Sequence, residues 1–293
     1  MQNSSNNTTQ GGEGAFGTLY IVSTPIGNLD DITARAVKVL GDVSVIAAED
    51  TRHSSRLLDQ LGLQKFLLSY HDHNEQGRGA DLLRRLQSGE SVALISDAGT
   101  PLVSDPGYRL VKSAQEAGIK VVPIPGASAM LAALVVSGLP SDRFSFEGFA
   151  PAKGAAREQF LQRVGAASCT SILYEAPHRI LSLLESCQQL FEANREVVLC
   201  RELTKRFETV LRGTPTQLLD VVRNDSDQQR GEMVLLVSPA PAQVVDDLQL
   251  EKLGRLLIQE LPVSRAAKVL AAWSGGKRAD IYQLLEQWAD KAQ

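Results

Sequence analysis

The sequence predicts an α/β fold made of two domains, because short apolar segments typical of strands alternate with segments of helical apolar spacing. Five such strand and helix units begin at Tyr20, Ala47, Phe66, Val92 and Val121. This order is typical of a mostly parallel sheet with helices on both faces and right-handed crossovers. With 293 residues, of which 43% are hydrophobic, the chain is long enough for two globular domains.

The elements of the first domain follow from apolar spacing and from the turn residues between the apolar runs. Runs such as Leu19–Val22 and Val92–Ile95 precede loops rich in Gly, Pro and Asp, and amphipathic segments follow these loops. Asp30 or Asp31 is expected to cap the first helix. The expected order is strand 19–22, helix 32–40, strand 43–48, helix 54–61, strand 66–69, helix 75–87, strand 92–95, a helix from Pro106, strand 119–122 and helix 127–136.

Composition and apolar patterning divide the chain into four parts, which are a tail, two α/β domains and a C-terminal helical element. The first residues are rich in Asn, Ser, Thr, Gln and Gly, which predicts a disordered tail. After the second set of strands and helices, a linker and three short helical segments follow, with Ser264 as an expected N-cap and a break at Gly275 and Gly276. The predicted parts are a tail over 1–17, α/β domains over 18–123 and 124–240, with second-domain strands at 144–149, 171–174, 196–200, 208–212 and 232–237, and a helical element over 245–293 that either binds RNA or caps the second domain.

Charge and cysteine content exclude several classes of protein. The net charge of −4 argues against broad, non-specific binding of nucleic acid, so an RNA contact would need local basic patches. Cys169, Cys187 and Cys200 have neither metal-type spacing nor an even disulfide set, which predicts reduced packing residues and no zinc site. No apolar run has the length of a membrane span, and the chain has no signal-type leader, so we expect a cytoplasmic protein.

The loop Ser96–Gly107 between a strand and a helix is crowded with small residues and two prolines. Such a composition is typical of a backbone that approaches a ligand closely, or of a tight connection. Asp105 suits the N-cap of the next helix and Pro106 its first position. Loops at Pro25, Asp97 and Pro125 would all open at the carboxyl edge of the sheet, where ligands bind in parallel sheets, so together they favour a ligand site.

Further polar clusters follow other strands of the predicted sheets. Residues 49–53 follow the second strand, where Asp50 or Thr51 could also cap the next helix. His71 and His73 flank an acid, but no third metal ligand is placed in sequence, so substrate contact is favoured over metal binding. The charged residues after the strands of the second domain are, each taken singly, more typical of solvated loops.

Seven motifs occur in order along the chain: Leu19–Leu29, Ala48–Arg52, Tyr70–Glu75, Ser96–Gly107, Pro125–Ala129, Tyr174–Arg179 and Arg201–Lys205. Together they resemble the ribosomal RNA small subunit methyltransferase I (RsmI) family of the tetrapyrrole-methylase fold group. The resemblance implies two α/β domains with an S-adenosylmethionine cleft between them, and usually a homodimer. It also implies 2′-O-methylation of a cytidine in the decoding centre of 16S ribosomal RNA, with the assembled 30S subunit as partner.

The resemblance implies the cofactor-binding residues, and the chemistry of methyl transfer to RNA adds candidates for two further roles; no residue is assigned to a metal. A ribose hydroxyl needs a base that takes its proton during attack, so titratable side chains near the cleft are candidate catalytic groups. Cationic side chains are candidates for RNA phosphates. The candidates are Glu49, His71, Glu75, Glu175 and His178 for catalysis, Pro25, Asp97, Ala98, Gly99, Val103, Ser104, Ala127, Ser128, Ala129, Tyr174 and Met233 for the cofactor, and Arg52, Arg179, Lys205, Arg265 and Lys277 for RNA.

Two alternatives follow from the same motifs. The porphyrin and precorrin methylases of the fold group typically carry Gly-Asp-Pro where this chain has Ser96-Asp97-Ala98, and a Gly-rich first loop where it has Pro25-Ile26-Gly27-Asn28. These departures make a tetrapyrrole substrate the second candidate. A non-catalytic ribosome-assembly factor with the same fold is the third, and the retained cofactor-loop motifs argue against it.

Overall fold

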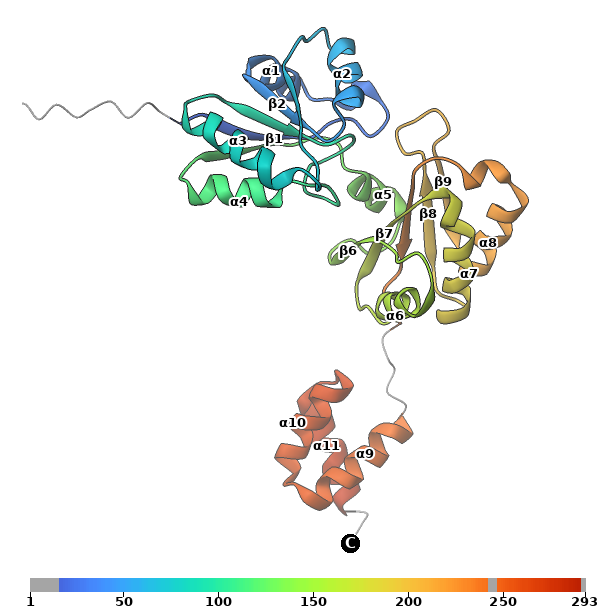
Figure 1. The fold of residues 1–293 in the computed structure, drawn as a ribbon. Helices are drawn as coiled ribbons and strands as arrows, with labels where there is room; N and C mark the ends of the chain where they lie inside the picture. The colour runs from blue at the N-terminus through green and yellow to red at the C-terminus, as the bar shows by residue number, and fades with distance from the viewer. Residues whose placement is uncertain (1–15, 242–246, 291–293) are drawn as a thin grey trace, which may run out of the picture. The chain divides into compact units, whose positions relative to one another are not determined.

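The computed structural model describes residues 16–241 and 247–290, which form two compact units (Figure 1). The larger unit contains two sheets and extends to Ser238, and the smaller unit contains three C-terminal helices. The prediction of a tail falls mostly on residues 1–15, outside the described part of the chain. No described helix has the length and apolar character needed to cross a membrane.

The first sheet is fully parallel and has the strand order β3-β2-β4-β1-β5, which confirms the predicted architecture. Its central strands β2 and β4 are buried on both faces, as expected for apolar strands covered by helices on both sides. Its elements are β1 (Thr18–Val22), α1 (Ala34–Asp42), β2 (Val45–Ala48), α2 (Thr51–Gln60), β3 (Leu67–Ser69), α3 (Glu75–Gln87), β4 (Val92–Ile95), α4 (Tyr108–Glu116) and β5 (Lys120–Ile124).

Alternate residues of these strands pack into two cores on opposite faces of the first sheet. On one face, Val45 and Ala47 of β2 belong to a cluster with residues of α3 and α4. On the other face, Ile46 and Ala48 belong to a cluster with residues of α1 and α2. The alternation follows from the two-residue period of a strand.

The second sheet is mixed and has the strand order β6-β7-β10-β8-β9. Strands β6 and β7 are parallel, and the other neighbouring pairs are antiparallel. Its elements are α5 (Ala129–Ser137), β6 (Phe144–Phe149), α6 (Gly154–Gly165), β7 (Thr170–Glu175), α7 (Ile180–Leu190), β8 (Val197–Arg201), β9 (Thr209–Gly213), α8 (Pro215–Asn224) and β10 (Met233–Val237), with short 3₁₀ turns at Leu29–Asp31, Pro177–Arg179 and Ser226–Gln229.

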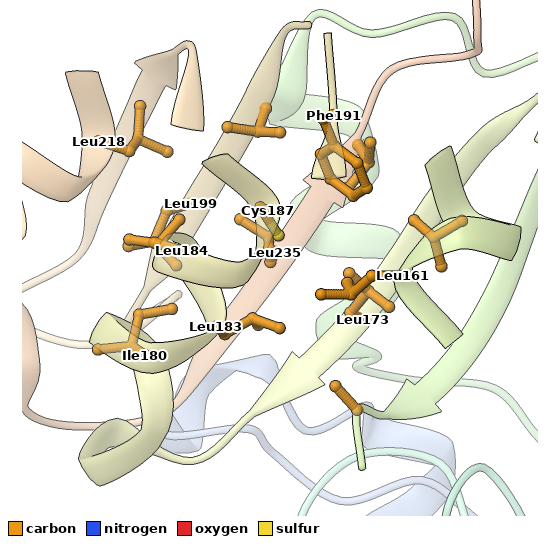
Figure 2. Close-up of a cluster of buried hydrophobic side chains, with 14 of the residues drawn as sticks. Leu161, Leu173, Ile180, Leu183, Leu184, Cys187, Phe191, Leu199, Leu218 and Leu235 are labelled. Carbon is orange, nitrogen blue, oxygen red and sulfur yellow. The ribbon is translucent and has the colours of Figure 1, made fainter. Parts of the chain in front are cut away.

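Helices also cover both faces of the second sheet. Figure 2 shows α7 over the strands, with Leu183 and Leu184 near Leu173, Leu199 and Leu235. On the opposite face, α5 packs with residues of the β8 and β10 strands and with the loop residues Ile26 and Leu203. Helix α5 therefore follows a strand of the first sheet in sequence but packs against the second sheet.

Two of the three cysteines are buried packing residues, as predicted. All three are free thiols, and Cys187 and Cys200 lie in the two cores of the second sheet. Burial raises the pKa of both thiols to about 12, so they stay protonated and unreactive at neutral pH. The described residues contain no cluster of potential ligands that could hold a metal ion.

The smaller unit is a bundle of α9 (Asp247–Glu260), α10 (Val263–Ser274) and α11 (Arg278–Asp290). Its core is formed by apolar residues of the three helices, including Leu270 and Leu285. The prediction of Ser264 as N-cap is wrong, because α10 already begins at Val263, after Pro262. Gly275 ends α10 in the left-handed conformation, as the predicted break requires.

Two predicted helix starts in the first domain are wrong. Thr33 caps α1 through its side chain, while Asp30 and Asp31 lie in the preceding 3₁₀ turn. Helix α4 begins only at Tyr108, so Asp105 is not its N-cap. Gly107 takes this position with a φ of 132°, and a Cβ there would lie 2.7 Å from Leu94, so only glycine fits the turn into the helix.

Candidate functional site

A cavity of about 350 Å³ within the larger unit is the candidate site. It is lined by loops at the carboxyl edge of the first sheet, by the start of α5 and by residues at the ends of β7 and β10 of the second sheet. The lining residues are Ile26, Asp97, Ala98, Gly99, Thr100, Val103, Ser104, Asp105, Ser128, Ala129, Phe149, Tyr174, Glu175, Ala176, Pro177, Cys200, Leu203, Glu232, Met233 and Val234.

The three small-residue loops meet beside this cavity. Thr24 and Gly99 form a bridge in which each backbone N–H donates to the other residue's carbonyl, at 2.8 and 3.1 Å. The Thr100 hydroxyl lies 2.9 Å from the Ser23 hydroxyl and donates to the Ala127 carbonyl at 3.1 Å. The loops at Pro25, Asp97 and Pro125 are therefore one hydrogen-bonded junction, as their common position in a parallel sheet predicts.

Backbone strain is concentrated in two loops that border the cavity. Among the described residues, the non-glycine residues with positive φ are Leu102 and Ser104 in one loop and Glu202 and Thr204 in the other. Each such conformation costs free energy for an L-residue, and it persists where the surrounding structure holds it. Strain at these positions is typical of a functional site.

The four carboxylates that line the cavity have different partners. The Asp97 carboxylate accepts the Asp50 backbone N–H at 3.0 Å. Glu232 pairs with Lys205 at 3.1 Å. The Glu175 side chain is fully buried and forms ion pairs with two arginines. Asp105, in contrast, is surrounded by other acids.

Burial and neighbouring acids shift two pKa values at the carboxyl edge of the first sheet. Burial raises the pKa of Asp105 to about 6, and the negative charges of Asp97 and Asp72 add to this shift. Burial also raises the pKa of Glu49, with a further contribution from Asp105 and Asp97. This wall of the site is thus acidic and disfavours further negative charge.

The opposite wall is mostly apolar. Met233 and Val234 of β10 line it together with Leu203. The Tyr174 ring makes edge contacts with Phe146 and Phe149, at centroid distances of 4.8 and 5.6 Å. Burial raises the pKa of the Tyr174 hydroxyl, which stays neutral. The cavity therefore combines an acidic wall with an apolar one.

Most residues predicted to contact a cofactor do line the cavity. The exceptions are Pro25, which follows Thr24 of the loop bridge, and Ala127, whose carbonyl accepts the Thr100 hydroxyl. The predicted residues found in the lining are Asp97, Ala98, Gly99, Val103, Ser104, Ser128, Ala129, Tyr174 and Met233.

The predicted catalytic candidates are less closely grouped. Of the five, Glu175 alone lines the cavity. Glu75 accepts the Tyr70 hydroxyl at 3.0 Å and pairs with Arg109 at 3.4 Å. The His71 ring contacts the Asn74 side chain, His178 is exposed on a 3₁₀ turn, and Glu49 lies close enough to the acidic wall for its pKa to respond.

The buried network around Glu175 favours a structural role for two candidates. Its carboxylate lies 2.9 Å from Arg179 and 3.8 Å from Arg157, and it accepts the Ala176 backbone N–H. The Arg179 guanidinium also donates to the Ala150 carbonyl. Glu175 is thus engaged with two cations, and Arg179 is not a free cation for a phosphate.

Of the other four cations predicted to bind RNA, two lie in the larger unit and two in the smaller unit. Arg52 is highly exposed and pairs with Asp50 at 3.3 Å. Lys205 pairs with both Glu202 and Glu232, and its alkyl chain packs over Gly27. Arg265 and Lys277 are exposed on the smaller unit. An RNA role for each of these residues stays a prediction.

Sequence reasoning missed Asp105 as a site residue. Its place before Pro106 predicts a helix cap, whereas Gly107 makes the helix begin later. It also missed Ile26, Phe149 and Leu203, because their place in the lining depends on how the two sheets face each other. Ile26 and Leu203 lie in segments that the sequence marks as functional, but an apolar side chain does not by itself distinguish a cavity lining from a core.

Comparison with known proteins gives the family. Residues 18–219 match the Tetrapyrrole (Corrin/Porphyrin) Methylases, and residues 244–288 match the RsmI C-terminal HTH domain. The ribosomal RNA small subunit methyltransferase I of Pseudomonas aeruginosa is 51% identical to this chain, and the match covers 91% of this chain and 96% of that protein. The protein of the same name from Escherichia coli O157:H7 is 48% identical, and the match covers 95% of this chain and 98% of that protein. The chain belongs to the ribosomal RNA small subunit methyltransferase I family.

Solved structures agree on the fold of this family. A cobalt precorrin-4 methyltransferase is 18% identical to this chain, with a TM-score of 0.55, and the match covers 75% of this chain and 94% of that protein. The uroporphyrin-III-C-methyltransferase from Thermus thermophilus is 19% identical with a TM-score of 0.52, covering 76% and 92%. At this identity the likeness shows the tetrapyrrole methylase fold alone.

The buried network predicts a stability effect. Glu175→Gln removes the anion shared by Arg157 and Arg179. The Arg157 side chain is only 6% exposed, so its positive charge would stay buried without a counter-charge. We expect a loss of about 3 kcal/mol in the free energy of unfolding, measured by urea denaturation.

The matched control is Glu185→Gln, which breaks the solvent-exposed pair with Arg223. Exposed pairs contribute about 0 to 1 kcal/mol, so this variant should unfold close to the wild-type urea midpoint. Equal effects of the two substitutions would contradict the structural role of Glu175.

Proposed function

We propose that this protein transfers a methyl group from S-adenosylmethionine to the ribose 2′-hydroxyl of a cytidine in the decoding centre of 16S ribosomal RNA. The observation that carries this proposal is the similarity over nearly the full chain to proteins named ribosomal RNA small subunit methyltransferase I. The cytidine and its 2′-hydroxyl rest on the family resemblance of the seven motifs. Such a substrate implies a cytoplasmic protein.

The cavity fits S-adenosylmethionine, which supplies an electrophilic methyl group on a sulfonium. The cationic parts of this molecule suit the acidic wall with Asp97 and Asp105, and its adenine suits the apolar wall with Met233 and Leu203. A volume of about 350 Å³ is in the range of small-molecule sites. Methyl transfer mainly requires that acceptor and donor are held in line, which the hydrogen-bonded loop junction favours.

The smaller unit offers a surface suited to RNA. Arg265, Val269 and Trp273 lie four residues apart on α10, so they share one exposed face, with Lys268 beside them. The helix contains no acidic residue, and the Trp273 side chain is 50% exposed. Cations bind phosphates without sequence preference, and an exposed indole can stack on an unpaired base. This face supports recognition of RNA by the C-terminal helices.

Self-association is a further part of the proposal. Leu131, Val135 and Val136 of α5 are exposed, and Val135 is 78% exposed. Helix α5 is apolar nearly all around, which is unusual for a helix that faces solvent. An exposed apolar face of this kind supports a homodimer.

A substitution at Asp97 tests whether the acidic wall binds the cofactor. Asp97→Ala removes a carboxylate of the lining and the acceptor of the Asp50 N–H, so we expect no detectable binding of S-adenosylmethionine by titration calorimetry. Circular dichroism should show a folded protein. Asp220→Ala, on the exposed face of α8, is the control and should bind as the wild type does. Retained affinity in Asp97→Ala would place the cofactor elsewhere.

The substrate is tested by mass mapping of ribosomal RNA from cells that lack the protein. One cytidine 2′-O-methyl group should be missing from the 16S RNA, and it should return when the gene is restored. A single-turnover assay with labelled S-adenosylmethionine and isolated small subunits should restore the mark in vitro. Full methylation in the deleted cells would favour a tetrapyrrole substrate, and binding to subunits without transfer would favour an assembly factor.

The α10 surface is tested by a double variant, Arg265→Ala with Lys268→Ala. Loss of two phosphate contacts should weaken RNA binding and reduce the slope of log K against log salt by about 2. Cofactor affinity should not change, because these residues lie in the smaller unit. The control is Lys112→Ala with Lys120→Ala, which removes two exposed lysines from the larger unit. An unchanged salt slope in the α10 variant would exclude this surface.

A further inference from the structure

Asp105 is a cavity residue without a structural task. It lines the cavity, and helix α4 begins three residues after it, so it does not cap that helix. The carboxyl group is half-buried and lies near the Ser96 hydroxyl, which donates to the Ala98 carbonyl at 3.3 Å. No ion pair to Asp105 is found in residues 16–241 or 247–290.

The other three carboxylates of the lining are engaged elsewhere. Glu175 is shared by two arginines, and Glu232 is paired with Lys205. Asp97 accepts the Asp50 backbone N–H. Among the described residues, Asp105 is thus the lining carboxylate that neither pairs with a cation nor accepts a backbone N–H.

The groups that face Asp105 come from several elements and supply no positive charge. Asp97 lies in the same loop after β4, Asp72 follows β3, Glu49 follows β2, and the Tyr174 hydroxyl comes from β7. Burial and these acids raise the pKa of Asp105 to about 6. Asp105 therefore remains ionised at neutral pH but holds a proton more strongly than an ordinary aspartate, which suits a general base near neutral pH.

We propose that Asp105 is the general base that takes the proton of the acceptor hydroxyl during methyl transfer, a role that rests on the proposed function. The O–H bond breaks as Asp105 receives the proton, and the oxygen electron pair forms the new bond to the methyl carbon. The electron pair of the broken carbon–sulfur bond stays on sulfur and discharges the sulfonium. Asp105 then releases its proton to water.

The test uses Asp105→Asn in the full chain, which keeps the shape of the side chain but not its basicity. In the single-turnover assay with isolated small subunits at neutral pH and saturating cofactor, the rate should fall about 10²- to 10⁴-fold. Calorimetry should show weaker but retained binding of S-adenosylmethionine, because Asp97 keeps a negative charge in the acidic wall, and saturating cofactor removes this effect from the measured rate. Asp105→Glu should recover part of the rate.

Two further measurements separate a base from a structural residue. At subsaturating cofactor the wild-type rate should rise with pH through about 6 and then level off, because the base must lose its proton. Asp72→Asn removes one repelling charge, so it should move this rise to lower pH. Carbon-13 NMR of the labelled, cofactor-free protein should show one aspartate that titrates near 6 and is missing in Asp105→Asn.

Three outcomes would overturn the role of Asp105. These are a wild-type rate in Asp105→Asn, a loss of cofactor affinity that accounts for the loss of rate, and an Asp105 carboxyl that titrates at the ordinary value. An inactive wild-type protein on small subunits would overturn the proposed function and this role together. An active wild type with an equally active Asp105→Asn would overturn this role alone.

Discussion

The site depends on the hydrogen-bonded bridge between Thr24 and Gly99. This bridge joins loops that follow β1 and β4, which are neighbours in the first sheet, and Thr100 extends the junction to the loop after β5. Close approach is required, since a Cβ on Gly126 would lie 2.9 Å from the Ser23 Cβ. The junction fixes the backbone around the cavity, so strained residues such as Ser104 are held in place by their neighbours rather than by their own preference.

Sequence periodicity could predict the first domain because its strands β2 and β4 are buried on both faces and its helices are amphipathic. The same patterns could not predict the start of α4, since the steric requirement at Gly107 involves Leu94 of β4, a contact absent from local sequence. The cofactor candidates were found through the family motifs. The apolar wall could not be found from any single segment, because Ile26 and Leu203 meet only when α5 packs on the second sheet.

An RNA methyltransferase must bind both a methyl donor and its RNA, and the acidic cavity suits only the first of these two tasks. An acidic wall repels phosphates, so the cavity itself cannot supply affinity for RNA. Cations near the cavity, such as Arg179 and Lys205, are already paired with carboxylates. Affinity for RNA must therefore come from other surfaces, and the acid-free α10 helix with Arg265 is suited to this task.

The same acidic wall connects the charge of the cofactor to the proton affinity of Asp105. A cation in the cavity would offset the repulsion from Asp97 and Asp72 and keep Asp105 ionised, ready to accept a proton. Methyl transfer removes that positive charge and leaves the acids facing one another. Uptake of a proton by Asp105 relieves this repulsion at the moment when the acceptor hydroxyl must lose one. Loss of the sulfonium charge and transfer of the proton therefore favour each other.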